Sequence, residues 1–502
     1  MSTVTLSLIS HTNVGKTTLA RTILRRDVGE VLDQAHVTEV AEGYDLVTAG
    51  EHVLRLWDTP GFGDSARLMA RLRHHGNPLG WFLHQVWDRY RDRALYSSQQ
   101  AVKNIRSEAD VVLYLVNASE DPADAGYMPH EMELLAWMRK PVLVLLNQTG
   151  ADGEAERVRV WEEALAGSEI VRDLLPLDAF TRCWLQEGIL LERVGGLLSD
   201  ARRPVMQELL GAWQQRNLAV FAESSALLGA YLERAVADVE PLDGQGGKTE
   251  RQRAMRVLSQ RLDDATRELM DRLIEAYGLK GRFQTVARER LHADFDLPGA
   301  TAWSSSQTTI LGAAMGGAAG GLVADVAVGG LSFGGGAVAG ALVGAAGAVS
   351  LRKGYQVVRG ENSQEVRWGA DFLSQLFQQS LLRYLAVAHF GRGRGEWRET
   401  GNPEHWNALI EQALDAPARE RLGKAIDTAR SAAPGTASDV EKDKAALAEG
   451  NEITGEFEAL ASSSLLAALS AGYPQAAPLL RLEASAQDAS QSAGAAAGEA
   501  ES

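Results

Sequence analysis

The sequence has a single cysteine, Cys183, among its 502 residues, and acidic residues outnumber basic ones. One cysteine excludes a disulfide bond within the chain and is typical of a reducing compartment. The formal net charge of −16 argues against a broad nucleic-acid-binding surface, so we expect no nucleic-acid partner. A strand is predicted at the very start, without the charged and apolar leader of a secretory signal. We therefore expect a cytoplasmic location.

A strand, a phosphate-binding loop and a helix are predicted in succession near the start of the chain. Residues 3–9 alternate like a strand, and residues 18–26 have helical periodicity. The loop between them reads Ser10-His11-Thr12-Asn13-Val14-Gly15-Lys16-Thr17. In such a loop, backbone N–H groups and the helix N-terminus bind phosphate oxygens. Lys16 would reach the outer phosphates and Thr17 would bind Mg²⁺, although Ser10 stands where glycine is usual.

A second phosphate-site motif follows the strand predicted at residues 53–57. It reads Asp58-Thr59-Pro60-Gly61. Asp58 would complete the Mg²⁺ site, and Gly61 would offer its N–H to a terminal phosphate because it lacks a Cβ. Between the two motifs, Thr38 has two interpretations. It is either a mobile threonine that closes on Mg²⁺ and the terminal phosphate, or an ordinary threonine at a strand edge.

The two motifs resemble those of the Era-like branch of the translation-factor class of GTPases. The resemblance covers residues 1–180 and implies an α/β P-loop NTPase fold with a doubly wound, mostly parallel sheet. It also implies GTP and GDP as ligands and Mg²⁺ as cofactor. The continuous apolar runs at residues 111–116 and 142–146 agree with buried parallel strands.

Two parts of the site depart from the pattern of that family. The family reads guanine with Asn-Lys-x-Asp, and this chain has Asn147-Gln148-Thr149-Gly150. Asn147 matches, but Gly150 replaces the carboxylate unless Asp152 substitutes for it, which leaves the choice between GTP and ATP open. Phe62 stands where Ras-like relatives have the glutamine that orients water.

An asparagine at the position of Asn13 helps several Era-like proteins bind a K⁺ ion that substitutes for a catalytic arginine. The resemblance extends this role to Asn13, and the alternative is that Asn13 only satisfies the loop backbone. The candidate catalytic residues are Asn13, Lys16 and Thr38, and the candidate Mg²⁺ ligands are Thr17, Thr38 and Asp58. The candidate nucleotide-binding residues are Ser10, Asn13, Val14, Gly15, Lys16, Thr17, Thr18, Asp58, Gly61 and Asn147.

A long insertion at residues 64–110 follows the second motif and contains aromatic residues and arginines at helical spacing. It is either a surface that changes with the nucleotide and binds a protein effector or a second copy of the chain, or helices packed on the domain.

The second half reads as helical, apart from a stretch of Gly, Ala, Val and Leu at residues 308–349. Its glycines recur every four residues, at Gly312, Gly316 and Gly320 and again at Gly336, Gly340 and Gly344. This spacing favours closely packed helices, and the first arm is long enough to span a bilayer. The alternatives are a hairpin in contact with the inner membrane and a soluble glycine-zipper hairpin, which Asp325 favours.

Residues 1–400 together resemble a bacterial family of GTPase-like proteins whose C-terminal half is a domain of unknown function. The predicted parts are a GTPase domain at 1–200, helical regions at 204–300 and 354–432, the hairpin at 301–353, and a tail at 433–502 that is disordered from residue 484. We expect a slow or activated Mg²⁺-dependent GTPase that switches a membrane-associated helical half. The alternatives are a nucleotide-binding membrane scaffold with little hydrolysis and a dynamin-like membrane remodeller.

Overall fold

The chain folds into two compact units. The computed structural model describes residues 2–12, 14–25, 41–73, 80, 93–148, 154–177, 183–242, 247–281, 355–359, 364–391, 403–432 and 440–480. The N-terminal unit comprises residues 1–218, 389–395 and 475–502, and the helical unit comprises residues 219–388 and 396–474.

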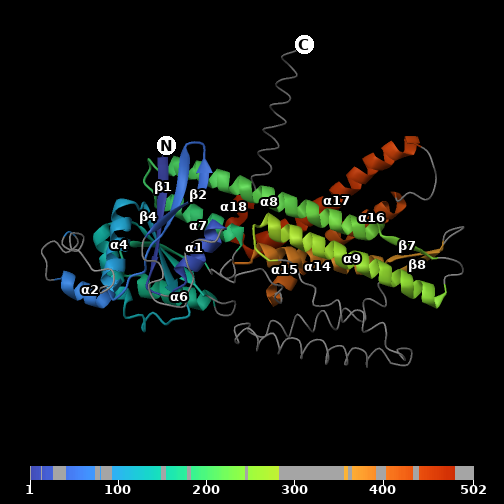
Figure 1. Ribbon diagram of the computed structural model, residues 1–502. Coiled ribbons are helices and arrows are strands. Elements are labelled where there is room, and N and C mark those ends of the chain that lie inside the picture. Colours follow the sequence, from blue (N-terminus) through green and yellow to red (C-terminus); the bar gives the residue numbers. More distant parts are fainter. Residues whose placement is uncertain are drawn as a thin grey trace, which may run out of the picture. The chain divides into compact units, whose positions relative to one another are not determined.

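A six-stranded sheet in the order β2-β3-β1-β4-β5-β6 forms the centre of the N-terminal unit (Figure 1). Its strands are β1 (Ser2–Ser10), β2 (Glu42–Ala49), β3 (His52–Asp58), β4 (Val111–Asn117), β5 (Val142–Asn147) and β6 (Val171–Pro176). Only β2 runs antiparallel to its neighbour, β3, and the other neighbours pair in parallel. The sheet confirms the predicted doubly wound, mostly parallel fold.

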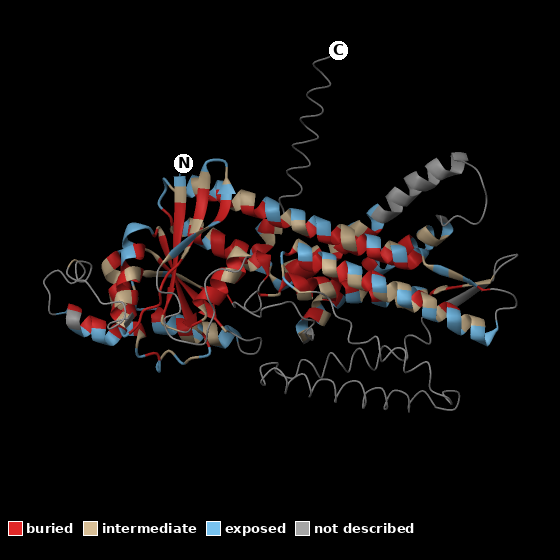
Figure 2. Ribbon diagram, viewed as in Figure 1, coloured by how far each residue is buried: buried red, intermediate tan, exposed pale blue. Residues whose placement is uncertain are grey.

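Helices cover both faces of this sheet, because side chains along a buried strand point alternately to either side. Ile9, Tyr114 and Val144 belong to one core with helices α2 (Ser65–Leu72), α4 (Arg93–Ser107), α5 (Met128–Met138) and α6 (Glu154–Leu165). Helix α1 (Lys16–Leu24) contacts β1, β2 and β3, and α7 (Trp184–Leu197) contacts β6. The central strands β1, β4 and β5 are buried almost throughout, whereas most residues of the edge strands β2 and β6 are exposed or half-buried (Figure 2).

The predicted tail contributes to the N-terminal unit. Helix α18 (Ala477–Leu480) places Leu479 in the core, where the Leu479 carbonyl oxygen accepts a hydrogen bond from Gln214. Gln214 lies in α8 (Arg203–Ala237), a helix whose residues up to Leu218 belong to the N-terminal unit and whose later residues belong to the helical unit.

The helical unit is mainly α-helical, as predicted. It contains the end of α8 together with α9 (Lys248–Ala276), α14 (Ala370–Ala388), α15 (Glu404–Ala413), α16 (Ala416–Ala432) and α17 (Val440–Gly472). Helix α14 packs against α9, α15 and α16. In its core the hydroxyl of Tyr277 donates a 2.9 Å hydrogen bond to that of Tyr384, and the Tyr384 ring meets Phe221 edge to face.

A small antiparallel sheet in the helical unit departs from the prediction of helical regions at 204–300 and 354–432. Its strands are β7 (Val239–Leu242), β8 (Tyr355–Arg359) and β9 (Gln364–Trp368), in the order β7-β9-β8. The strands are short, and β7 pairs with a strand far along the chain, so local periodicity does not reveal the pairing.

The predicted hairpin at residues 308–349 and the disordered tail from residue 484 lie outside the described residues. Within the described ranges, no helix combines the length and apolar character needed to cross a membrane.

Two glycines of α8 should respond differently to alanine. A Cβ on Gly229 would lie 2.6 Å from the backbone nitrogen of Glu458 in α17, whereas a Cβ on Gly211 would meet nothing within 4 Å. We expect Gly229→Ala to lower the free energy of unfolding by about 1–3 kcal/mol. The control Gly211→Ala should raise it by about 0.5–1 kcal/mol, because alanine favours the helix. Urea titration followed by circular dichroism measures both, and equal effects would contradict the packing.

Candidate functional site

The phosphate-binding loop connects β1 to α1, and its glycine has the conformation that this turn requires. Gly15 forms the N-cap of α1 with φ of +91°, a region that other residues rarely adopt. A Cβ there would also lie only 2.9 Å from Nδ2 of Asn147. Helix α1 therefore begins directly after the loop, and its first backbone N–H groups lie at the loop. Helix N-termini in this arrangement bind anions.

Three predicted side chains meet at the carboxyl ends of β1 and β3. The Lys16 ammonium lies 3.1 Å from Oδ1 of Asp58, and the Thr17 hydroxyl donates a 2.9 Å hydrogen bond to Oδ2. All three residues are buried, and a buried charge requires a partner. The opposite charges of Lys16 and Asp58 meet this requirement for each other. A hydroxyl and a carboxylate beside a phosphate-binding loop are hard oxygen ligands of the kind that suits Mg²⁺.

The segment after Asp58 runs alongside the end of β1. Thr59 donates from its backbone N–H and from its hydroxyl to the carbonyl oxygen of Leu8. The Phe62 N–H donates to the carbonyl oxygen of Ser10 at 2.9 Å, and a Cβ on Gly61 would lie 3.3 Å from that oxygen. The backbone of Gly61 thus lies against the start of the phosphate-binding loop.

Phe62 faces the core rather than the loop. Its side chain is fully buried in the cluster that also contains Ile9, Leu68 and Met69. An apolar ring there has no group that orients water, in agreement with the interpretation of the sequence.

Asn147 stabilises the loop from the end of β5. It is fully buried, and its Nδ2 donates a 2.9 Å hydrogen bond to the carbonyl oxygen of Val14. The next residue, Gln148, has φ of +58°, and its carbonyl oxygen accepts a hydrogen bond from the Ser119 hydroxyl.

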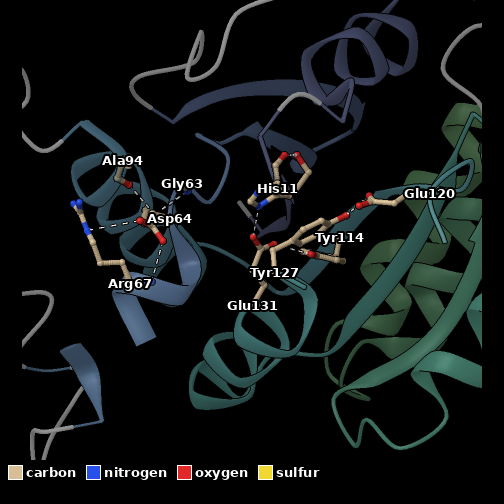
Figure 3. Close-up of polar contacts among 11 residues, drawn as sticks. His11, Gly63, Asp64, Arg67, Ala94, Tyr114, Glu120, Tyr127 and Glu131 are labelled. Carbon is tan, nitrogen blue, oxygen red and sulfur yellow. Dashed lines mark hydrogen bonds and ion pairs between the residues drawn. The ribbon is translucent and has the colours of Figure 1, made fainter. Parts of the chain in front are cut away.

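A second polar cluster lies behind the loop and is centred on Glu131 of α5 (Figure 3). Oε1 of Glu131 lies 2.6 Å from Nδ1 of His11, and Oε2 accepts a 2.6 Å hydrogen bond from the Tyr114 hydroxyl. The His11 ring stacks on Tyr127 with 4.0 Å between ring centroids.

Burial dominates the electrostatics of this cluster. The Glu131 side chain is fully buried, and burial raises its pKa, while the contacts with His11, Tyr114 and Ser65 oppose the rise. Burial also raises the pKa of the Tyr114 hydroxyl, so this hydroxyl stays a neutral donor.

The structure brings most of the predicted site residues together. Lys16, Thr17 and Asp58 contact one another, Asn147 contacts Val14 and Gly15, and Gly61 lies beside Ser10. Thr18 is buried in α1, where its carbonyl oxygen accepts a hydrogen bond from Thr22. Asn13, Thr38, Gly150 and Asp152 lie outside the described residues, as do residues 81–92 of the insertion.

The sequence analysis missed the cluster around Glu131. One signal was present, because Glu131 shares a helix face with Met128, Leu134 and Leu135, and all three are buried. A carboxylate on an apolar face requires partners, although the sequence does not show which residues these are.

Both halves of the chain match known protein families. A family model described as "Domain of unknown function (DUF3482)" matches residues 173–453, more than half of the chain. The chain belongs to this family. A second model, described as "50S ribosome-binding GTPase", matches residues 5–148, which carry both phosphate motifs. This member of the DUF3482 family therefore has a GTP-binding P-loop GTPase domain at its N-terminus.

Solved structures with similarity to the chain include two of Era. An Aquifex aeolicus Era variant bound to GDP·AlF4⁻ is 20% identical, with a TM-score of 0.31, and the match covers 40% of this chain. The match spans 58% of the length of that protein. Era in complex with MgGDPNP and 16S ribosomal RNA is 15% identical, with a TM-score of 0.31 and coverage of 55% of this chain and 90% of that one. No curated protein matches the chain.

Proposed function

We propose that this protein is a Mg²⁺-dependent GTPase whose nucleotide state switches the activity of its helical unit. The contact of Asp58 with both Lys16 and Thr17 carries the proposal, because it joins two motifs that are distant in sequence at one phosphate site. The family match at residues 5–148 supports GTP as the ligand. In this role Thr17 and Asp58 hold Mg²⁺, which neutralises charge on the phosphates.

Each residue of the site has a defined task in the proposed reaction. The Lys16 ammonium stabilises negative charge on the outer phosphates, and the first N–H groups of α1 bind the inner ones. The Gly61 N–H contacts the terminal phosphate. Asn147 keeps the Val14 carbonyl in place, which maintains the curvature of the loop.

Lys16→Ala tests the site assignment. Loss of a buried ammonium that makes charge-assisted contacts should weaken the binding of labelled GTP by about a hundredfold or more. Lys103→Ala is the matched control, because Lys103 lies exposed on α4 of the same unit and should leave the affinity unchanged. Fluorescence titration measures both, and unchanged affinity of Lys16→Ala would show that the site is elsewhere.

We propose further that hydrolysis depends on K⁺ bound with the help of Asn13. The burial of Phe62 supports this proposal, since Phe62 supplies no catalytic group. Single-turnover hydrolysis should be about tenfold or more faster in potassium than in sodium buffer, and Asn13→Ala should remove the difference. Equal rates in both buffers would contradict the K⁺ role. Negligible hydrolysis in both would instead favour the second candidate, a scaffold that binds GTP and hydrolyses little.

We also propose that the helical half acts at a membrane and contacts it through residues 308–349. The support is the glycine-rich, apolar sequence of this segment. After carbonate extraction of cell membranes, the full chain should stay in the pellet, and a variant lacking residues 308–349 should appear in the supernatant. Release of the full chain into the supernatant would contradict an inserted hairpin.

A further inference from the structure

Glu131 of α5 contacts two segments of the N-terminal unit that are distant from each other in sequence. Its carboxylate bonds to His11 in the phosphate-binding loop and to Tyr114 in β4 (Figure 3). An ionised carboxylate only accepts hydrogen bonds, so Nδ1 of His11 carries the proton in that state. The carboxylate is fully buried, and each partner that is lost leaves a polar group without water to replace it.

The residues between Gly61 and Ser65 are held from both sides. His11 pairs with Phe62 in a parallel β-bridge, so the backbone that follows Gly61 is bound to the loop. The Gly63 N–H donates a 3.1 Å hydrogen bond to the Ser98 hydroxyl, and a Cβ on Gly63 would lie 2.6 Å from that of Ala94. These contacts restrict movement of residues 61–65 relative to the proposed phosphate site.

His11 connects this segment to the phosphate-binding loop, and Glu131 holds His11. His11 belongs to the loop by its backbone, and its ring is fixed between Tyr127 and the Glu131 carboxylate. The buried carboxylate thus holds the loop residue whose backbone pairs with Phe62, directly after Gly61.

We propose that Glu131 and His11 are positioning residues that hold Gly61 at the terminal phosphate and thereby set the preference for GTP over GDP. The proposal rests on the proposed function, because it assumes that a guanine nucleotide occupies this site. Neither side chain touches the nucleotide in this role. GDP lacks the phosphate that Gly61 contacts, so the loss of either positioning residue should affect GTP much more than GDP.

A purely structural cluster would behave differently. If Glu131 and His11 only stabilise the core, their loss should lower the melting temperature and weaken GTP and GDP equally. The ratio of the two affinities therefore separates positioning from stability, and it does not depend on hydrolysis.

Two pairs of matched variants test the proposal. His11→Leu keeps apolar bulk against Tyr127 and removes the bond to Glu131, whereas His11→Asn places an amide N–H where Nδ1 lies. Glu131→Leu removes both hydrogen bonds at similar volume, whereas Tyr114→Phe removes only the one to β4. His11 has a side chain that is 28% exposed, so its variants should fold even if Glu131→Leu does not.

The experiment titrates each full-length variant with GDP and with a non-hydrolysable GTP analogue in the presence of Mg²⁺. Each leucine variant should lower the ratio of GTP-analogue affinity to GDP affinity by about tenfold, with GDP affinity changed by less than about threefold. His11→Asn and Tyr114→Phe should keep the wild-type ratio. An unchanged ratio in His11→Leu, or an equal loss for both nucleotides, would overturn the positioning role. A wild-type protein that binds neither nucleotide would instead overturn the proposed function.

Discussion

The parallel pairing of β1 with β3 is the constraint on which the nucleotide site depends. It places Leu8 opposite Asp58, so the two strands end side by side and their loops leave the sheet together. The pairing continues past the strands, through the contacts of Thr59 with Leu8 and of Phe62 with Ser10. Because of it, Asp58 meets Lys16 and Thr17, and the Gly61 backbone lies against the phosphate-binding loop.

This arrangement separates binding from catalysis. Lys16, Thr17 and Asp58, the groups proposed to bind phosphates and Mg²⁺, lie together, whereas Phe62, which follows the second motif, is part of the hydrophobic core. The burial of Phe62 gives the segment after Gly61 a fixed attachment, and the pairing of Phe62 with His11 adds a backbone one. A rigid attachment suits a protein that discriminates between GTP and GDP through a backbone N–H, with the chemical step left to an ion or a partner.

The sequence predicted the first unit well because its elements are local and its motifs have a physical meaning. The strand, loop and helix at residues 2–24 and the strands around residues 111–147 lie where periodicity places them. Contacts between distant residues were not predictable in this way. The pairing of β7 with β9 and the bond of His11 to Glu131 join residues more than a hundred positions apart, and local pattern does not specify such partners.

The most direct test of the account is a competition titration of the wild-type chain with labelled GTP in Mg²⁺ buffer. The account predicts that the chain binds labelled GTP and that unlabelled GTP displaces it at a far lower concentration than ATP. Displacement by ATP and GTP at equal concentrations, or no binding of labelled GTP at all, would contradict a GTP site built from Lys16, Thr17 and Asp58.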